Sequence, residues 1–412
     1  MKTIRNSVVS ALVFFFLFSM ALRLWGVSES NFFSTDELTV VPAAEYFFSN
    51  GNFMPDEWSH PPLKYYFLNA GIKVFGDNVY GWRLVNVILG SLTVVVLFLL
   101  GKELFSDKRV ASLAAFFLSV EPVHIVYSRT FYGEISSLFF FLVGVYISVR
   151  YLKGGRTSPV GAGICLGLAL AQKWYYLPVM VVLPAWIIIK KYRDGGLKRL
   201  DFLHMTTVFL ILPVAVYSST FYPWFQRGYS VPEFLGMQLD AYREMQSQTM
   251  DWFVNPFFMA SPSSPWDWFI KPVVYGRLAQ PDGLWGKFEI FMGNSAVWLL
   301  AVPAFAFAAY RIWKQRDGSL VFVIVLFAAM YSQFVVVKRA IFLYSAVVVL
   351  PFVYLAVAYF IVALAGRKTL YFVMLAAVIV IWSLYIYPFA TGRAVPLSLY
   401  GPVISAGRIP IQ

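Results

Sequence analysis

Long apolar blocks, separated by short polar or basic stretches, run along almost the whole chain. Most blocks approach the ~20 residues that a helix needs to cross the hydrocarbon core of a bilayer. Backbone polar groups in hydrocarbon must be satisfied within their own segment, so each block predicts a membrane-spanning helix. The pattern therefore predicts an all-α polytopic membrane protein. About eleven spans are expected, near residues 7–26, 79–101, 109–127, 135–152, 160–173, 174–189, 202–222, 292–310, 319–337, 341–362 and 369–388.

Composition supports a membrane-embedded chain and excludes a soluble globular domain. Of the 412 residues, 59% are hydrophobic and only 13% are charged, which is too little charge to cover a water-exposed surface. The net charge of +12 would suit a nucleic-acid-binding protein, but the basic residues stand in short loops between apolar blocks. No nucleic-acid partner is therefore expected. The one cysteine, Cys165, cannot form a disulfide within the chain.

The basic loops indicate how the chain is oriented in the membrane. They fall on the same side as Lys2 and Arg5, which places the N-terminus in the cytoplasm under the positive-inside rule. No clear A-x-A cleavage site follows the first apolar block, so we expect an uncleaved first span in a multi-pass protein of the cell or inner membrane. The loop residues concerned are Lys102, Lys108, Arg109, Lys153, Arg156, Lys190, Lys191, Arg193, Lys198, Arg199, Arg311, Lys314, Arg316, Arg367 and Lys368.

Three regions are expected on this topology. Residues 1–222 form an N-terminal transmembrane module that includes an outer loop at 27–78. Residues 223–291 form an outer-face segment rich in aromatic residues, and residues 292–412 form a C-terminal transmembrane module. Both outer segments are dense in large apolar residues, which is not typical of disordered linkers. We expect them to form short helices along the outer membrane surface.

Two adjacent acids, Asp36 and Glu37, stand just after the first span and are the candidate catalytic residues. A structural interpretation is that Ser34 and Glu37 form a capping box, because early acids suit the positive end of a helix dipole. A functional interpretation is that a carboxylate beside a membrane cavity acts as general base toward a hydroxyl. Neighbouring helical residues point about 100° apart, so we do not expect both carboxylates to face one substrate; Glu37 stands where a capping box needs it, which leaves Asp36 free to face the cavity.

A second candidate group lies in MPDEWSHPPLKYYF, residues 54–67. Its consecutive prolines stop a helix from running through it and fix Glu57, His60 and Lys64 near the bilayer surface. All three are candidate substrate- or phosphate-binding residues, although a histidine beside two prolines is also typical of a turn. Asp36, Glu57 and His60 lack a recognised ligand spacing, so no metal ligands are assigned and no cofactor is expected. A divalent metal is left open.

Five basic residues stand at the predicted outer ends of spans, against the positive-inside bias. They are Arg83, Arg129, Lys173, Lys338 and Arg339. Ionisable residues at membrane depth are functional candidates, and basic groups that converge on one outer cavity would suit a phosphate. The alternative is that they reach the interface or pair with nearby acids, Arg83 with Asp77 and Arg129 with Glu134.

An ordered set of motifs resembles the protein O-mannosyltransferase family, a group of GT-C membrane glycosyltransferases that depend on polyprenyl-phosphate sugars. The motifs are TDE, HPPLK, WRLVNVILG, YSR, LALAQKWYYLP, SSPWDWFIKPVVYGR, GNSAVWLL and KRAIFLYSAVVVLPF, which together extend from about residue 30 to 352. The resemblance extends more loosely to bacterial enzymes that transfer aminoarabinose to lipid A. Two departures concern the site: Glu134 stands where the family has Asp, and Leu343, Tyr344 and Ser345 replace a run that contains a histidine.

The resemblance implies a GT-C fold and transfer of a sugar, with mannose as one candidate, to an acceptor hydroxyl at the outer membrane face. It implies that Asp36 is the general base, that one displacement inverts the anomeric configuration, and that outer-end cations neutralise the leaving polyprenyl phosphate. The catalytic module would then be residues 1–222. The expected partners are the lipid-linked sugar donor, a protein, lipid or glycan acceptor, and membrane lipids.

Two other classes of function stay open on the sequence. Short discontinuous spans and intramembrane charges are also typical of a transporter or lipid flippase, although no broken-helix segment recurs in two halves of the chain. A non-catalytic partner of a glycosylation complex is the remaining class. Sugar transfer by the purified protein would separate the enzyme from both.

Overall fold

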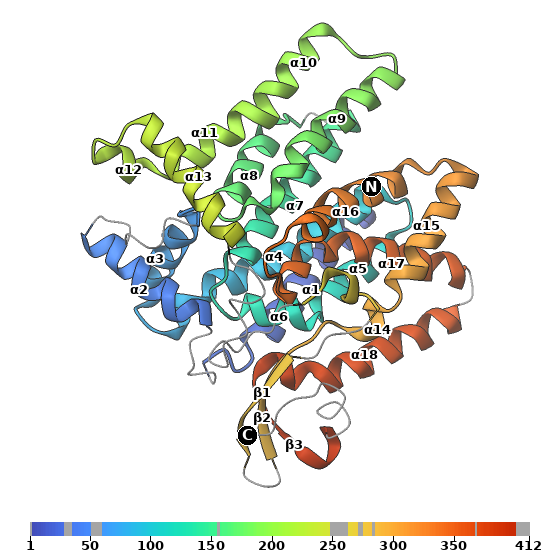
Figure 1. Ribbon diagram of the computed structural model, residues 1–412. Coiled ribbons are helices and arrows are strands. Elements are labelled where there is room, and N and C mark those ends of the chain that lie inside the picture. Colours follow the sequence, from blue (N-terminus) through green and yellow to red (C-terminus); the bar gives the residue numbers. More distant parts are fainter. Residues whose placement is uncertain are drawn as a thin grey trace.

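The computed structural model describes residues 2–28, 35–50, 60–154, 157–247, 263–270, 275–281, 285–366 and 369–400. Within these ranges the chain is almost entirely helical and carries one small sheet (Figure 1). The helices are α1 (Lys2–Leu24), α2 (Thr35–Asn50), α3 (Leu63–Phe75), α4 (Val79–Leu104), α5 (Lys108–Ser119), α6 (Pro122–Ser128), α7 (Gly133–Leu152), α8 (Val160–Leu170), α9 (Leu177–Arg193), α10 (Arg199–Thr206), α11 (Leu212–Ser219), α12 (Tyr222–Gln226), α13 (Val231–Ser247), α14 (Ser295–Trp298), α15 (Ala301–Gln315), α16 (Gly318–Val336), α17 (Leu350–Ala365) and α18 (Thr369–Thr391). The shorter elements are the 3-10 helices η1 (Trp174–Tyr176), η4 (Pro265–Asp267) and η5 (Leu343–Val348), the π-helical turn η2 (Thr207–Ile211), and the strands β1 (Tyr275–Pro281), β2 (Trp285–Phe291) and β3 (Ala394–Pro396).

The predicted helical polytopic fold is confirmed, although fewer helices than expected reach spanning length. In the described part of the chain, eight helical segments are long and apolar enough to cross a membrane, and α5 with α6 makes a ninth if this pair, bent by 58°, is one span. The two remaining apolar segments, predicted at 160–173 and 341–362, contain helices that are shorter than a membrane span. Helix α8 has 11 residues, and α17 has 16.

The bend between α5 and α6 follows from the local sequence. Pro122 stands in the first turn of α6, where its fixed φ suits a new helix and its ring prevents continuation from α5. Glu121 is the N-cap, and its carboxylate accepts a hydrogen bond from the Val123 N–H at 3.1 Å. The chain therefore turns inside the apolar block.

Helix α17 lies at the centre of the bundle, and α1 and α18 lie at its surface. Every residue from Leu350 to Ala358 is buried, which is expected of a helix that is apolar all round and surrounded by other helices. In contrast, α1 exposes Phe14 and Leu17, and α18 exposes Ile381 and Leu384, as lipid-facing helices do.

The outer segments contain the expected surface helices and also a sheet that was not expected. Helices α2 and α3 fall in the first segment, and α12 and α13 fall in the second. The Tyr66 hydroxyl of α3 donates at 3.1 Å to the carbonyl of Thr220, which stands between α11 and α12. The expectation of helices is wrong for 275–291, where β1 and β2 pair antiparallel and β3 adds to β2. Alternation of polar and apolar residues in KFEI, within β2, is typical of a strand.

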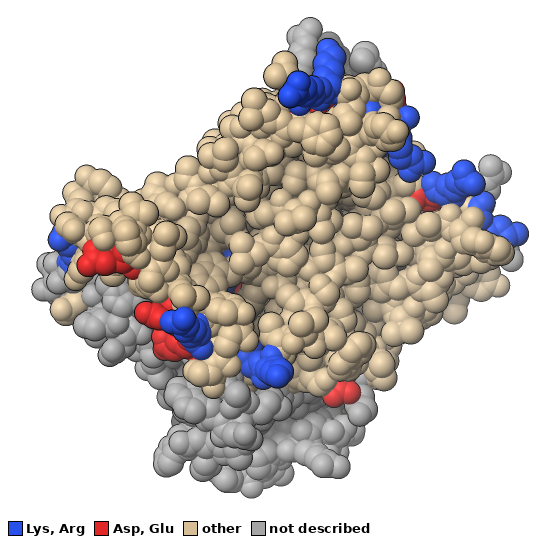
Figure 2. Space-filling view, turned by 45° about the horizontal axis from the view of Figure 1, so that its top comes forward, with Lys and Arg blue, Asp and Glu red and all other residues tan. Residues whose placement is uncertain are grey.

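Basic side chains gather at one end of the molecule. Figure 2 shows Lys and Arg mainly along the upper and right edges, whereas acids and fewer cations lie at the lower left. The turn between α9 and α10 lies at the end opposite the sheet (Figure 1). This distribution agrees with the sidedness predicted from the loops; the orientation itself stays a prediction.

Candidate functional site

Glu37 and Arg83 form a buried ion pair between α2 and α4. Arg83 Nη2 lies 2.8 Å from Glu37 Oε2, and Arg83 Nε donates to Glu37 Oε1 at 3.1 Å, which is the bidentate geometry of a strong pair. The side chains are 2% and 0% exposed. The alternative pairing of Arg83 with Asp77 is wrong, because the Asp77 carboxylate instead accepts from Trp82 Nε1 at 2.7 Å. Glu37 thus fixes the start of α2 against α4.

Lys173, in the break between α8 and η1, forms a second ion pair with Glu134 at the start of α7. Lys173 Nζ lies 2.8 Å from Glu134 Oε1, with exposed fractions of 13% and 1% for the two side chains. Glu134 stands in the first turn of α7, and Lys173 is the residue before η1, where its backbone is extended. The pair therefore holds the N-terminus of α7 against the lysine-containing segment.

Arg129 does not pair with Glu134, so that expectation is wrong. Its guanidinium donates to the backbone carbonyls of Arg23 at 3.2 Å, of Gly26 at 2.9 Å and of Thr391 at 3.4 Å. It also donates to the Trp25 carbonyl. These bonds hold the end of α6 against the ends of α1 and α18, because carbonyls at helix ends have no partner within the helix.

Residues 129–134, the turn after α6 with the first residues of α7, connect four of the ten predicted site residues. Phe131 N–H donates to Glu37 Oε1 at 2.7 Å, and Asn86 Nδ2 donates to the carbonyls of Thr130 at 3.0 Å and Tyr132 at 2.8 Å. Arg129 begins the turn and Glu134 ends it. The 129–134 turn thus brings the Glu37–Arg83 pair and the Glu134–Lys173 pair to one region of the fold.

The HPPLK motif also lies beside the lysine-containing segment. Leu63 N–H donates to the Ala171 carbonyl at 3.1 Å, two residues before Lys173. Lys64 is buried, and its ammonium lies 4.9 Å from the centroid of the Tyr65 ring. His60 is half-buried at the start of this motif.

The Lys338–Arg339 pair differs from the other cations in its surroundings. Lys338 is exposed and Arg339 is half-buried in the segment between α16 and η5. Neither makes an ion pair with a carboxylate of the described residues; Arg339 Nε donates only to the Ala340 carbonyl, at 3.5 Å. Their charges are therefore not compensated within the described part of the chain.

The positions where the chain departs from the family motifs lie close to this region. The ring of Tyr344 packs 5.7 Å from that of Tyr127 and 6.1 Å from that of Tyr132, next to the 129–134 turn. The Ser345 hydroxyl lies 3.4 Å from that of Tyr175, two residues after Lys173. Substitutions in this run therefore change the surroundings of the candidate site.

Two candidate residues cannot be placed by their side chains. Asp36 is the second residue of α2, but its side chain lies outside the described part of the structure, as does the whole of Glu57. Ser34 also lies outside, so the capping box stays a prediction. Among the described side chains, no three His, Cys, Asp or Glu residues gather as metal ligands would; the metal requirement stays untested.

Buried charges inside the apolar blocks were missed as candidates, although their sequence positions could have indicated them. Arg23 Nη2 lies 2.6 Å from His124 Nδ1, and arginine is always protonated, so this histidine nitrogen is the acceptor. The Glu121 carboxylate accepts from Trp298 Nε1 at 3.0 Å and also from the hydroxyl of Tyr354. Ionisable groups within spans are rare, and this rarity is the signal.

Comparison with known proteins identifies the class of this arrangement. Residues 59–217 match the family described as dolichyl-phosphate-mannose-protein mannosyltransferase. The resemblance predicted from the motifs is confirmed. The polyprenol-phosphate-mannose–protein mannosyltransferase of Mycobacterium tuberculosis is 25% identical over 360 residues, which are 73% of this chain and 69% of the relative. The undecaprenyl phosphate-α-4-amino-4-deoxy-L-arabinose arabinosyl transferase 1 of Pseudomonas fluorescens is 24% identical over 338 residues, 77% of this chain and 53% of that protein.

The fold agrees with this class over nearly its whole length. The fold is similar to that of a chain in the structure of the S. cerevisiae protein O-mannosyltransferase Pmt1–Pmt2 complex bound to the sugar donor, with a TM-score of 0.78 and 12% sequence identity. The match covers 97% of this chain and 92% of that chain. The chain is a lipid-phosphate-sugar-dependent membrane glycosyltransferase.

Proposed function

We propose that the glycosyltransferase transfers mannose from a polyprenyl-phosphate carrier to a hydroxyl of a protein at the outer membrane face. The observation that carries this is the 129–134 turn, which connects residues from four family-like motifs at one region of the bundle. The family match and the mycobacterial relative both carry mannose and a protein acceptor in their names. Aminoarabinose with a lipid acceptor is the second candidate, favoured by the Pseudomonas relative.

In the proposed reaction, Asp36 takes the proton from the acceptor hydroxyl as its oxygen attacks the anomeric carbon. The bond from that carbon to the phosphate oxygen breaks, and its electron pair leaves with the polyprenyl phosphate. Attack from the face opposite the phosphate inverts the anomeric configuration. Glu37 and Arg83 support the start of α2, on which Asp36 stands.

The leaving phosphate needs a positive charge that is not already compensated. The charge of Lys173 is compensated by Glu134, and the guanidinium of Arg129 donates to backbone carbonyls. Lys338 and Arg339 pair with none of the described carboxylates, so we assign them the larger part of this role. Arg83, Lys64 and His60 then shape the donor site rather than neutralise the phosphate.

The test is sugar transfer by the purified protein in nanodiscs with polyprenyl-phosphate mannose and a peptide rich in serine and threonine. Release of polyprenyl phosphate should fall about 10²–10⁴-fold in Asp36→Asn, the usual contribution of a general base. Glu45→Gln, an exposed acid on the same helix, is the matched control and should keep wild-type turnover. Equal turnover in both variants would remove Asp36 from the mechanism.

The same preparation separates the remaining classes. Movement of the lipid-linked sugar across sealed vesicles without transfer would indicate a transporter or flippase. Transfer only after another membrane protein is added would indicate a non-catalytic partner. Assays with aminoarabinose donor and with EDTA then identify the sugar and any divalent metal requirement.

A further inference from the structure

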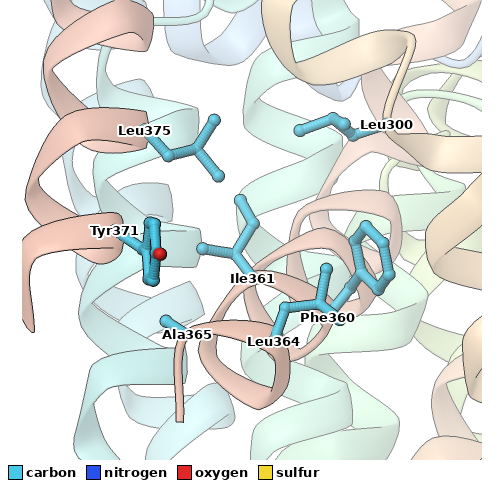
Figure 3. Close-up of a pocket in the computed structure, with 7 residues that line it drawn as sticks. All are labelled: Leu300, Phe360, Ile361, Leu364, Ala365, Tyr371 and Leu375. Carbon is cyan, nitrogen blue, oxygen red and sulfur yellow. The ribbon is translucent and has the colours of Figure 1, made fainter. Parts of the chain in front are cut away.

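An apolar cavity of about 300 Å³ lies between the end of α17 and the start of α18 (Figure 3). Its lining comes from α17 and α18, with Leu300 at the N-cap of α15; the α17 residues are Phe360, Ile361, Leu364 and Ala365, and the α18 residues are Tyr371 and Leu375. In the close-up the side chains of the two helices face each other across the gap. Of these seven side chains only Tyr371 carries a polar atom, so the cavity offers water almost no partners.

The position of the cavity determines what can fill it. Residues Val373–Thr391 of α18 form a candidate membrane span, and the cavity residues Leu364 and Tyr371 are 65% and 59% exposed at the surface of the bundle. Water finds few partners in such an apolar space. The lining side chains therefore lose van der Waals contacts unless a hydrocarbon group fills the space. A chain from a surrounding lipid is the hydrocarbon available there.

Positive charge stands directly at the end of this cavity. Arg109 Nη1 donates to the carbonyl of Gly366 at 2.9 Å, and Gly366 follows the cavity residue Ala365. Arg109 is half-exposed, pairs with Asp107 at 2.7 Å, and is adjacent to the exposed Lys108. Among the described residues of this end of α4, α5, α15 and α16, basic side chains outnumber acidic ones: Lys102, Lys108, Arg109, Arg311, Lys314 and Arg316 against Glu103, Asp107 and Asp317.

We propose that this cavity binds one anionic glycerophospholipid, with an acyl chain between α17 and α18 and the headgroup phosphate at Arg109 and Lys108. Arg109 Nε and Nη2 donate to Asp107 and Nη1 donates to the Gly366 carbonyl, so the guanidinium is held in a fixed plane and keeps one N–H on each terminal nitrogen for a phosphate oxygen. Because Asp107 compensates the charge of Arg109, the net positive charge for the phosphate comes from Lys108, which pairs with none of the described carboxylates. Basic residues at a membrane surface also attract anionic lipids. The lipid would fill the space that separates α18 from the central helix.

The site differs from the proposed donor site. Lys338 and Arg339 precede η5 and the start of α17, whereas the cavity lies at the end of α17, about 24 Å along a helix of 16 residues. A polyprenyl phosphate shares the chemistry of a phosphate with a hydrocarbon chain, but a donor whose phosphate is at the catalytic end cannot place it here. We therefore assign the cavity to a phospholipid.

Native mass spectrometry of the full-length protein tests the proposal, with phosphatidylglycerol and phosphatidylcholine added in turn. The wild type should retain one phosphatidylglycerol per chain. Ala365→Phe fills the cavity and should lower retention at least about tenfold, because several buried methylenes of the lipid are displaced. Ala328→Phe, on the exposed face of α16, is the matched control and should retain the lipid. Arg109→Gln should remove the preference for phosphatidylglycerol over phosphatidylcholine while leaving some binding of both.

Three results would overturn the proposal. One is equal retention in Ala365→Phe and Ala328→Phe, and another is no headgroup preference in the wild type. The third is displacement of phosphatidylglycerol by stoichiometric polyprenyl phosphate, which would assign the cavity to the donor carrier. If Ala365→Phe does not fold, Leu364→Trp narrows the exposed mouth instead and should lower retention in the same direction. None of these readouts depends on sugar transfer.

Discussion

At the scale of single residues, the ion pairs Glu37–Arg83 and Glu134–Lys173 indicate which charged side chains hold helices together rather than contact a substrate. Glu37 has its carboxylate enclosed by Arg83 and the Phe131 N–H, with no exposed surface from which to reach an acceptor hydroxyl. A general base must contact the proton that it removes. This geometry favours Glu37 as a support for α2; the role of Asp36 as the base stays a proposal.

The first prediction concerns Glu37. Glu37→Gln should destabilise the protein by about 3–5 kcal/mol, because the Arg83 guanidinium stays buried without a countercharge. Thermal unfolding in detergent measures the loss, with Glu45→Gln as the exposed control. Adding Arg83→Gln to Glu37→Gln should recover part of the stability. If the Glu37→Gln variant unfolds at the same temperature as the wild type but transfers no sugar, Glu37 is instead a catalytic residue.

The second prediction concerns Lys173 and Glu134. A double-mutant cycle with Lys173→Met and Glu134→Gln should give a coupling of about 0.5–3 kcal/mol in unfolding stability, because the two charges are in contact in a shielded environment. The KM for the lipid-linked donor should change less in Lys173→Met than in Arg339→Gln. The reverse order of KM effects would show that Lys173 binds the phosphate directly.

The charged residues that meet at the 129–134 turn could be named from the sequence, but their partners could not. Arg83 and Lys173 were visible as charges at the ends of apolar blocks. The alternative interpretation paired them with acids nearby in the chain, Asp77 for Arg83 and Glu134 for Arg129. The actual pair of Arg83 is 46 residues away, because helix packing rather than chain proximity decides which charges meet.

At the scale of elements, apolar blocks predict where helices lie but not how each one begins, bends or pairs. The block at 109–127 reads as one span, whereas Pro122 and the capping carboxylate of Glu121 divide it into α5 and α6. The β1–β2 hairpin was missed because aromatic residues dominated the interpretation of 223–291. The alternation in KFEI was the available signal.

The third prediction concerns close packing of α8 against η2 and α11. A Cβ on Gly163 would lie 2.1 Å from the Val208 carbonyl oxygen, which is backbone and cannot move aside easily. Gly163→Ala should therefore destabilise the protein by about 1–3 kcal/mol, as overpacking does. Gly161→Ala is the control in the same helix, because its Cβ would meet only the Ile147 side chain at 3.4 Å. Similar melting temperatures for the two variants would contradict this packing.

At the scale of the whole molecule, function requires that the two ends of the bundle face different compartments. The candidate site is built at the ends of α1, α6 and α18, together with the start of α7, whereas the basic loops lie at the turn between α9 and α10 and at the ends of α4 and α15. The donor phosphate and the phospholipid proposed for the cavity would then lie at opposite faces of the membrane. Both proposals thus depend on one orientation.

The fourth prediction tests this orientation by cysteine labelling in a Cys165→Ala background. Gly196 is exposed between α9 and α10, and Glu233 is exposed on α13. An impermeant maleimide should label Glu233→Cys in intact cells and Gly196→Cys only after permeabilisation, because the positive-inside rule places the α9–α10 turn in the cytoplasm. The opposite pattern would put Asp36 in the cytoplasm with α13, since α2 and α13 belong to the two segments expected on the same face. Transfer at the outer face would then be impossible for this glycosyltransferase, whatever the chemistry of its site.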